Sequence, residues 1–111
     1  MAGQDHRVTM KVAPDTPVGT ILSTDLAGLA LVVMRHAKGW SAAPDTCPHA
    51  ACSLSRMGEV VDGTTLVCNC HGAEFDLVTG AVLLDPAETP LQLLDVVESE
   101  DSKCLTITRG D

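Results

Sequence analysis

The sequence of 111 residues is short of aromatic side chains. Trp40 and Phe75 are its only aromatic residues, and it contains no tyrosine. Apolar residues nevertheless make up 45% of the chain and charged residues 20%, a composition typical of a globular protein. We therefore expect one domain over residues 1–111, with a core built mainly from aliphatic side chains.

Basic residues are also scarce. Seven lysines and arginines face 15 aspartates and glutamates, which gives a formal net charge of −8. Such a surface repels nucleic acid and anionic lipid, so neither is expected as a partner. The charge favours instead protein partners that carry basic docking patches.

Long hydrophobic runs are absent. The longest, residues 29–34, falls far short of the roughly 20 residues that cross a bilayer. The opening MAGQDHRVTMKV has no charged-then-apolar signal pattern and no twin arginine. We expect a cytoplasmic, monomeric protein without a membrane partner.

The segments that remain are short and punctuated by Gly, Pro and Asp, with little repetition at helical spacing. Val8, Met10 and Val12 alternate with polar residues and predict a half-buried strand, while residues 29–34 predict a fully buried one. The pair Asp62-Gly63 predicts a hairpin turn between strands at 58–61 and 66–67. Further strands are expected at 74–78, 81–84, 91–97 and 105–108. The pattern predicts an all-β sandwich or barrel.

Five cysteines are too few for a disulfide-knit secreted scaffold, and their number is odd. Four of them lie between positions 47 and 70, in two motifs that also contain histidine. Cys47 and His49 form a Cys-x-His pair, and Cys68 and His71 form a Cys-x-x-His pair. The hairpin expected between the motifs could bring them together as adjacent loops around one metal site.

Two cysteines and two histidines leave two kinds of metal site open. Thiolate is a soft ligand suited to zinc or iron–sulfur clusters, and imidazole suits zinc or iron. The site could therefore be a structural zinc ion or a cluster of two irons. Haem attachment is excluded because it needs Cys-x-x-Cys-His, and a classical zinc finger is disfavoured because each motif here mixes one Cys with one His.

Beyond these four residues, the sequence resembles the Rieske iron–sulfur family. The stretch CNCHGAEFD at 68–76, followed by Thr79-Gly80, resembles the second loop of that family, and DPAETPL at 85–91 resembles its proline-containing loop. The similarity extends from about residue 29 to residue 108. It implies an antiparallel β-sandwich with a small cluster-binding subdomain, here at about residues 45–76.

The resemblance implies one Rieske-type [2Fe–2S] cluster, with Cys47 and Cys68 on the inner iron and His49 and His71 on the outer iron. Neutral imidazoles make such a cluster easier to reduce, with potentials of roughly −150 to +300 mV against about −400 mV for plant-type ferredoxins. The implied function is that of an electron-transfer protein and not an enzyme. A ferredoxin of this kind carries single electrons from a reductase to a terminal oxygenase.

One feature of the sequence departs from most small Rieske ferredoxins, and another departs from the respiratory branch of the family. Cys52 and Cys70 resemble the cysteine pair that forms a disulfide in the respiratory branch of the family. Ala73 and Phe75 stand where that branch has serine and tyrosine hydroxyls directed at sulfur. We therefore expect Ala73, Phe75 and Pro86 to tune the potential, and the missing hydroxyls to keep it intermediate or low within the Rieske range.

Two other functions are weighed against the ferredoxin. The chain could be the small Rieske subunit of a larger oxidoreductase, of the arsenite oxidase or nitrite reductase type, or a zinc-stabilised binding module that would be colourless. Cys104 is expected to be a plain small residue, and His6 and His36 are expected to be solvated.

Overall fold

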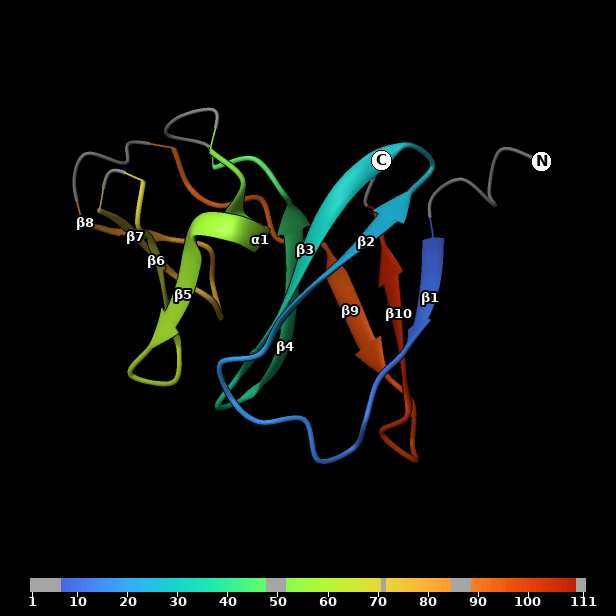
Figure 1. Ribbon diagram of the computed structural model, residues 1–111. Coiled ribbons are helices and arrows are strands. Elements are labelled where there is room, and N and C mark those ends of the chain that lie inside the picture. The colour runs from blue at the N-terminus through green and yellow to red at the C-terminus, as the bar shows by residue number, and fades with distance from the viewer. Residues whose placement is uncertain (1–6, 48–51, 71, 85–88, 110–111) are drawn as a thin grey trace.

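Figure 1 shows the computed structural model, which describes residues 7–47, 52–70, 72–84 and 89–109. Across these residues the chain forms ten strands and one helical turn. The elements are β1 (Arg7–Lys11), β2 (Ile21–Leu26), β3 (Leu29–His36), β4 (Gly39–Pro44), α1 (Leu54–Met57), β5 (Gly58–Val61), β6 (Thr65–Cys68), β7 (Ala73–Asp76), β8 (Val82–Leu84), β9 (Asp95–Glu98) and β10 (Cys104–Thr108).

The strands form three sheets, and every pair of neighbouring strands within them is antiparallel. Their orders are β1-β10-β9, β2-β3-β4 and β5-β6-β7-β8. In Figure 1 the sheet β2–β4 lies between the other two, with β5–β8 on the left and β1, β9 and β10 on the right. The predicted all-β antiparallel class is confirmed.

Strand β3 supplies side chains to two hydrophobic cores. Val32 and Met34 belong to the core that also contains residues of β6 and β7. Leu31 and Val33 belong to the core that contains residues of β10. Because the middle of β3 is buried on both faces, residues 29–34 form an apolar run that does not alternate.

The predicted hairpin at Asp62-Gly63 is present. It joins β5 to β6, with Val61 opposite Thr65. Asp62 has φ 52° and Gly63 has φ 79°, the left-handed conformations that tight hairpin turns require. The backbone N–H of Ala37, in the turn after β3, donates to the Gly63 carbonyl at 2.8 Å. The hairpin tip is thereby fixed to the central sheet.

Several sequence predictions need correction. Strands β2 and β4 and helix α1 were not predicted, and the strand expected at 91–97 is confined to β9. At residue 91 the backbone N–H instead donates to the Gly80 carbonyl at 2.8 Å. His36, expected to be solvated, is only 4% exposed. In the part of the chain that is described, no helix is long and apolar enough to span a bilayer.

Candidate metal centre

The first cysteine motif follows the end of β4. Its described cysteine, Cys47, is buried with 2% of its surface exposed. The backbone N–H of Cys47 donates to the carbonyl of Cys52 at 2.8 Å, and Thr46 forms an isolated antiparallel bridge with Ser53. These contacts pair the two ends of the loop, so that Cys47 starts a closed loop and not an open strand.

The second motif begins at the last residue of β6. Cys68 is fully buried and pairs with Gly58 on β5 and Ala73 on β7. The N–H of Gly72 donates to the Cys68 carbonyl at 2.8 Å, and the N–H of Asn69 donates to the Met57 carbonyl at 2.8 Å. The position of Cys68 is therefore set by the sheet on both sides.

A disulfide between Cys52 and Cys70 connects the two loops, with their Cα atoms 6.5 Å apart and a sequence separation of 18. This is the pair that the resemblance to the respiratory branch implied. Cys47 and Cys68 lie outside the disulfide and share one apolar cluster, against which Cys52 and Cys70 pack. The structure thus brings all four cysteines of the motifs together.

The chemistry of the described donors fits an iron–sulfur cluster. Two buried sulfurs come from adjacent loops, and thiolate in an apolar setting is the usual protein ligand of such clusters. His49, His71 and Pro86 lie outside the described residues, so their roles stay predictions. Within the described ranges, no group of three or more His, Cys, Asp or Glu side chains could hold a metal ion.

Two of the residues expected to tune the potential are described and lie in the core that contains Cys47 and Cys68. Ala73 is buried and directly opposite Cys68, and Phe75 is buried opposite Leu66, in the same core. Neither side chain contains a hydrogen-bond donor. Cys104, by contrast, is paired with Lys11 in the sheet β1-β10-β9 and is only half-buried.

His36 is a buried titratable residue outside this centre. Burial lowers its pKa, and the positive charges of Arg35 and Lys38 act in the same direction, while a backbone hydrogen bond at Trp40 and the charge of Asp76 oppose them. The Nδ1 atom of His36 accepts the backbone N–H of Lys38 at 3.2 Å, which also requires an unprotonated Nδ1. The neutral ring is therefore the form that the fold accommodates.

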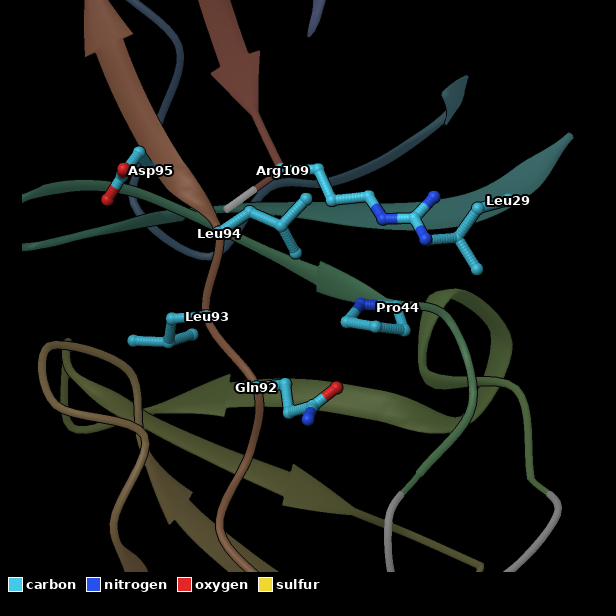
Figure 2. Close-up of a pocket in the computed structure, with 7 residues that line it drawn as sticks. All are labelled: Leu29, Pro44, Gln92, Leu93, Leu94, Asp95 and Arg109. Atoms are coloured by element: carbon cyan, nitrogen blue, oxygen red, sulfur yellow. The ribbon is translucent and has the colours of Figure 1, made fainter. Parts of the chain in front are cut away.

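The structure also contains a cavity of about 350 Å³, shown in Figure 2. Its lining consists of Leu29, Pro44, Gln92, Leu93, Leu94, Asp95 and Arg109. In Figure 2 the side chain of Arg109 extends past Leu94 towards Leu29, whereas Asp95 points away from it. The lining contains neither cysteine nor histidine, so this cavity is separate from the cysteine loops.

One residue of the first loop was missed by the sequence analysis. The carboxylate of Asp45 accepts hydrogen bonds from Ser53 and Ser55, across the loop that contains Cys47. Ser53 at the N-cap predicts from sequence that this serine itself caps the helix, so no sequence signal indicated Asp45.

Two buried cysteines in adjacent, cross-linked loops of a small antiparallel β domain fit an iron–sulfur protein. A family model, the Rieske [2Fe–2S] domain, matches residues 6–98. The chain belongs to this family.

Relatives with known roles cover most of the chain. Ferredoxin CarAc of Metapseudomonas resinovorans is 34% identical over 98 residues, which span 86% of this chain and 90% of that protein. The 3-phenylpropionate/cinnamic acid dioxygenase ferredoxin subunit of Photorhabdus laumondii subsp. laumondii is 36% identical over 78 residues, 69% of this chain and 73% of the relative.

Solved structures agree with these relatives. A chain in the complex of reduced oxygenase and oxidized ferredoxin in carbazole 1,9a-dioxygenase has a TM-score of 0.82 and 29% identity, covering 96% of this chain and 97% of that one. The ferredoxin of carbazole 1,9a-dioxygenase from Nocardioides aromaticivorans IC177 has a TM-score of 0.75 and 26% identity, covering 92% and 98%.

These findings confirm the family, the cofactor and the general role expected from the sequence. The protein binds one Rieske-type [2Fe–2S] cluster and transfers electrons, and its relatives are ferredoxin components of dioxygenase systems and not their catalytic subunits. They favour the ferredoxin over the subunit of a larger oxidoreductase and over the zinc-stabilised module.

Proposed function

We propose that this protein is the soluble, cytoplasmic ferredoxin of an oxygenase system, which accepts one electron from a reductase and delivers it to a terminal oxygenase. The observation that carries the proposal is similarity over nearly the whole chain to ferredoxin components of such systems. A monomer with a single domain over residues 1–111, and a cluster-binding part at about 45–76, accords with this role.

The proposed ligands are Cys47 and Cys68 for the inner iron and His49 and His71 for the outer iron. The burial of both cysteines supports their assignment to the inner position, because the apolar side chains around them exclude water. When bound, the cluster supplies a one-electron centre. The role of the chain is to hold it, to shield its inner side and to present its outer side to partners.

The distribution of charge supports partners with basic docking patches. Residues 45–91 contain seven carboxylates and one cation, Arg56, whereas the remaining residues contain eight carboxylates and six cations. The formal net charge is therefore −6 in the first group and −2 in the second, although the first group is the smaller. A positively charged surface on a partner protein would raise the rate at which the partner encounters the part of the protein formed by residues 45–91.

Two of these carboxylates occupy matched positions on one sheet. Glu59 on β5 and Glu74 on β7 both lie opposite Val67 on β6, so the three side chains form a row across the sheet. The side-chain amide of Asn69, which follows Cys68 directly, donates to Glu59 at 3.3 Å. This contact places the row beside the second cysteine loop.

Stopped-flow oxidation tests both the function and the direction of docking. The protein, fully reduced with dithionite and freed of excess reductant, is mixed with an excess of oxidised cytochrome c, a basic haem protein. We expect one electron per chain to be transferred, at a rate that falls as salt is added. Transfer of no electron, or of two, would contradict the proposed function.

A pair of charge-matched variants locates the docking surface. Glu59→Gln with Glu74→Gln should slow the reaction several-fold at low ionic strength. Glu98→Gln with Glu100→Gln, which removes the same charge from the far sheet and its turn, should have a much smaller effect. Equal slowing by both pairs would show that net charge matters and that this row does not.

A further inference from the structure

One carboxylate adds side-chain hydrogen bonds to the backbone pairing at the ends of the loop that contains Cys47. The Oδ1 atom of Asp45 accepts the backbone N–H of Ser55 at 2.6 Å. The Oδ2 atom accepts the hydroxyl of Ser55 at 2.7 Å and that of Ser53 at 3.1 Å. These three hydrogen bonds join the residue before the loop to the residues after it, and we call the set of Asp45, Ser53 and Ser55 the Asp45 latch.

The latch also replaces the usual cap of α1. The first N–H groups of a helix lack partners within it, and a Ser, Thr, Asp or Asn at the N-cap normally accepts one of them. Ser53 occupies the N-cap of α1 but makes no capping hydrogen bond with its side chain. Asp45 takes over this role, because its carbonyl accepts the N–H of Leu54 at 2.7 Å and its carboxylate accepts that of Ser55.

The latch lies where it can control the position of Cys47. Asp45 is two residues before Cys47, and Ser53 directly follows Cys52, whose carbonyl accepts the Cys47 N–H. The described part of the second loop is closed by backbone hydrogen bonds of Cys68 and its neighbours within the sheet. The ends of the first loop are also paired through the backbone, and there the Asp45 carboxylate adds three hydrogen bonds that the second loop does not have in its described part.

We propose that Asp45 is a positioning residue for the cluster: by accepting hydrogen bonds from Ser53 and Ser55 it fixes the first loop so that the Cys47 sulfur meets the inner iron. The inference rests on the proposed function and on Cys47 as a ligand. Asp45 does not touch the cluster in this account. It acts through the loop that carries the ligand, and its loss should weaken cluster retention more than it weakens the fold.

The test compares three variants of the cluster-loaded protein. Asp45→Ala removes every acceptor of the latch, whereas Asp45→Asn keeps an amide oxygen for the Ser55 N–H and can donate to the serine hydroxyls. Asp101→Ala is the matched control, because Asp101 also accepts a serine hydroxyl, from Ser99 at 2.7 Å, and a backbone N–H, from Lys103 at 3.1 Å, in the turn between β9 and β10.

Two readouts other than activity are measured. The first is the rate at which an iron chelator bleaches the visible absorbance, and the second is the width of the EPR lines of the reduced protein. We expect Asp45→Ala to bleach about tenfold faster than the parent and to show broadened lines, because hydrogen bonds to a charged acceptor are strong. Asp45→Asn and Asp101→Ala should stay within about threefold of the parent, with unchanged lines.

Three results would overturn the proposal. They are a parental bleaching rate in Asp45→Ala, an equal acceleration in Asp101→Ala, and an Asp45→Asn variant as fast as Asp45→Ala, which would point to charge instead of position. If Asp45→Ala does not fold, the Ser53→Ala, Ser55→Ala double variant replaces it and should also bleach faster. A parent protein that contains no cluster would refute the proposed function itself, before any variant is compared.

Discussion

The two hydrophobic cores of this protein share β3 but differ in what stabilises them. The core beside β1, β9 and β10 is aliphatic, and its buried members are Leu26, Leu31, Val33, Ala42, Leu105 and Ile107. The core beside β5–β8 contains the sole phenylalanine together with Cys47 and Cys68. Around it lie a disulfide and the Asp45 latch.

The comparison separates a scaffold from a functional unit. Packing alone accounts for the aliphatic core, where each buried Leu or Ile contributes roughly 2 kcal/mol. The other core contains the two cysteines that we propose as ligands of the inner iron, and its loops have covalent and polar constraints as well. The same division appears in the charge, of which −6 of the total −8 lies within residues 45–91.

The largest expected effect is the loss of a ligand. Cys47→Ser should abolish the visible absorbance and reduce the iron content to near zero, because a hydroxyl is a poor ligand for an iron–sulfur cluster. Cys104→Ser, which changes a half-buried cysteine in the other half of the protein, should keep both. Iron analysis and absorption spectra measure the cluster content of both variants. Full cluster content in Cys47→Ser would show that this residue is not a ligand.

The disulfide should make the next largest contribution. Replacing Cys52 and Cys70 together by serine should lower the free energy of unfolding by about 3 kcal/mol, since the bridge closes a loop of moderate length in the unfolded chain. Urea denaturation of the two proteins measures this difference. An unchanged midpoint, or two free thiols at these positions in intact protein by mass spectrometry, would contradict the prediction.

A smaller change should appear in the reduction potential. The double substitution Ala73→Ser with Phe75→Tyr introduces two hydroxyl donors into the core that contains Cys68 and should raise the midpoint, because hydrogen bonds to sulfur stabilise the extra electron. Ala42→Ser places a hydroxyl in the aliphatic core and should leave the midpoint unchanged. Voltammetry compares all three proteins, and equal midpoints would exclude this form of tuning.

The smallest effect concerns His36. Because burial lowers its pKa, the unfolded chain binds a proton more readily than the folded one. The contribution of the neutral ring to stability is therefore complete above the unfolded pKa of about 6.5 and is lost as the pH falls through the lower folded value. Urea midpoints between about pH 8 and pH 5 should fall less in His36→Gln than in the parent. If the urea midpoints of the two proteins changed equally with pH, the pH dependence would not come from His36.

Features that depend on neighbouring residues were predictable from the sequence. The apolar run at residues 29–34 predicted a buried strand, and the Asp62-Gly63 pair predicted the hairpin between β5 and β6. Each of these signals is made of residues adjacent in sequence. The burial or turn conformation that it indicates is required in the same way in any fold.

The features that were missed depend on distant contacts. Helix α1 is only four residues long and has its cap in Asp45, so no local pattern indicates it. His36 lies between Arg35 and Ala37 in a sequence typical of an exposed strand end. It is buried where the turn after β3 bonds to the hairpin tip at Gly63, a contact between two sheets that the local sequence does not reveal.

The measurement that tests the central claim most directly is a pair of spectra, optical and EPR, of the purified protein before and after dithionite. The account predicts a brown protein that bleaches and then shows a rhombic signal, with an average g value below that of [2Fe–2S] clusters held by four cysteines. A colourless, EPR-silent protein that contains one zinc ion would contradict it.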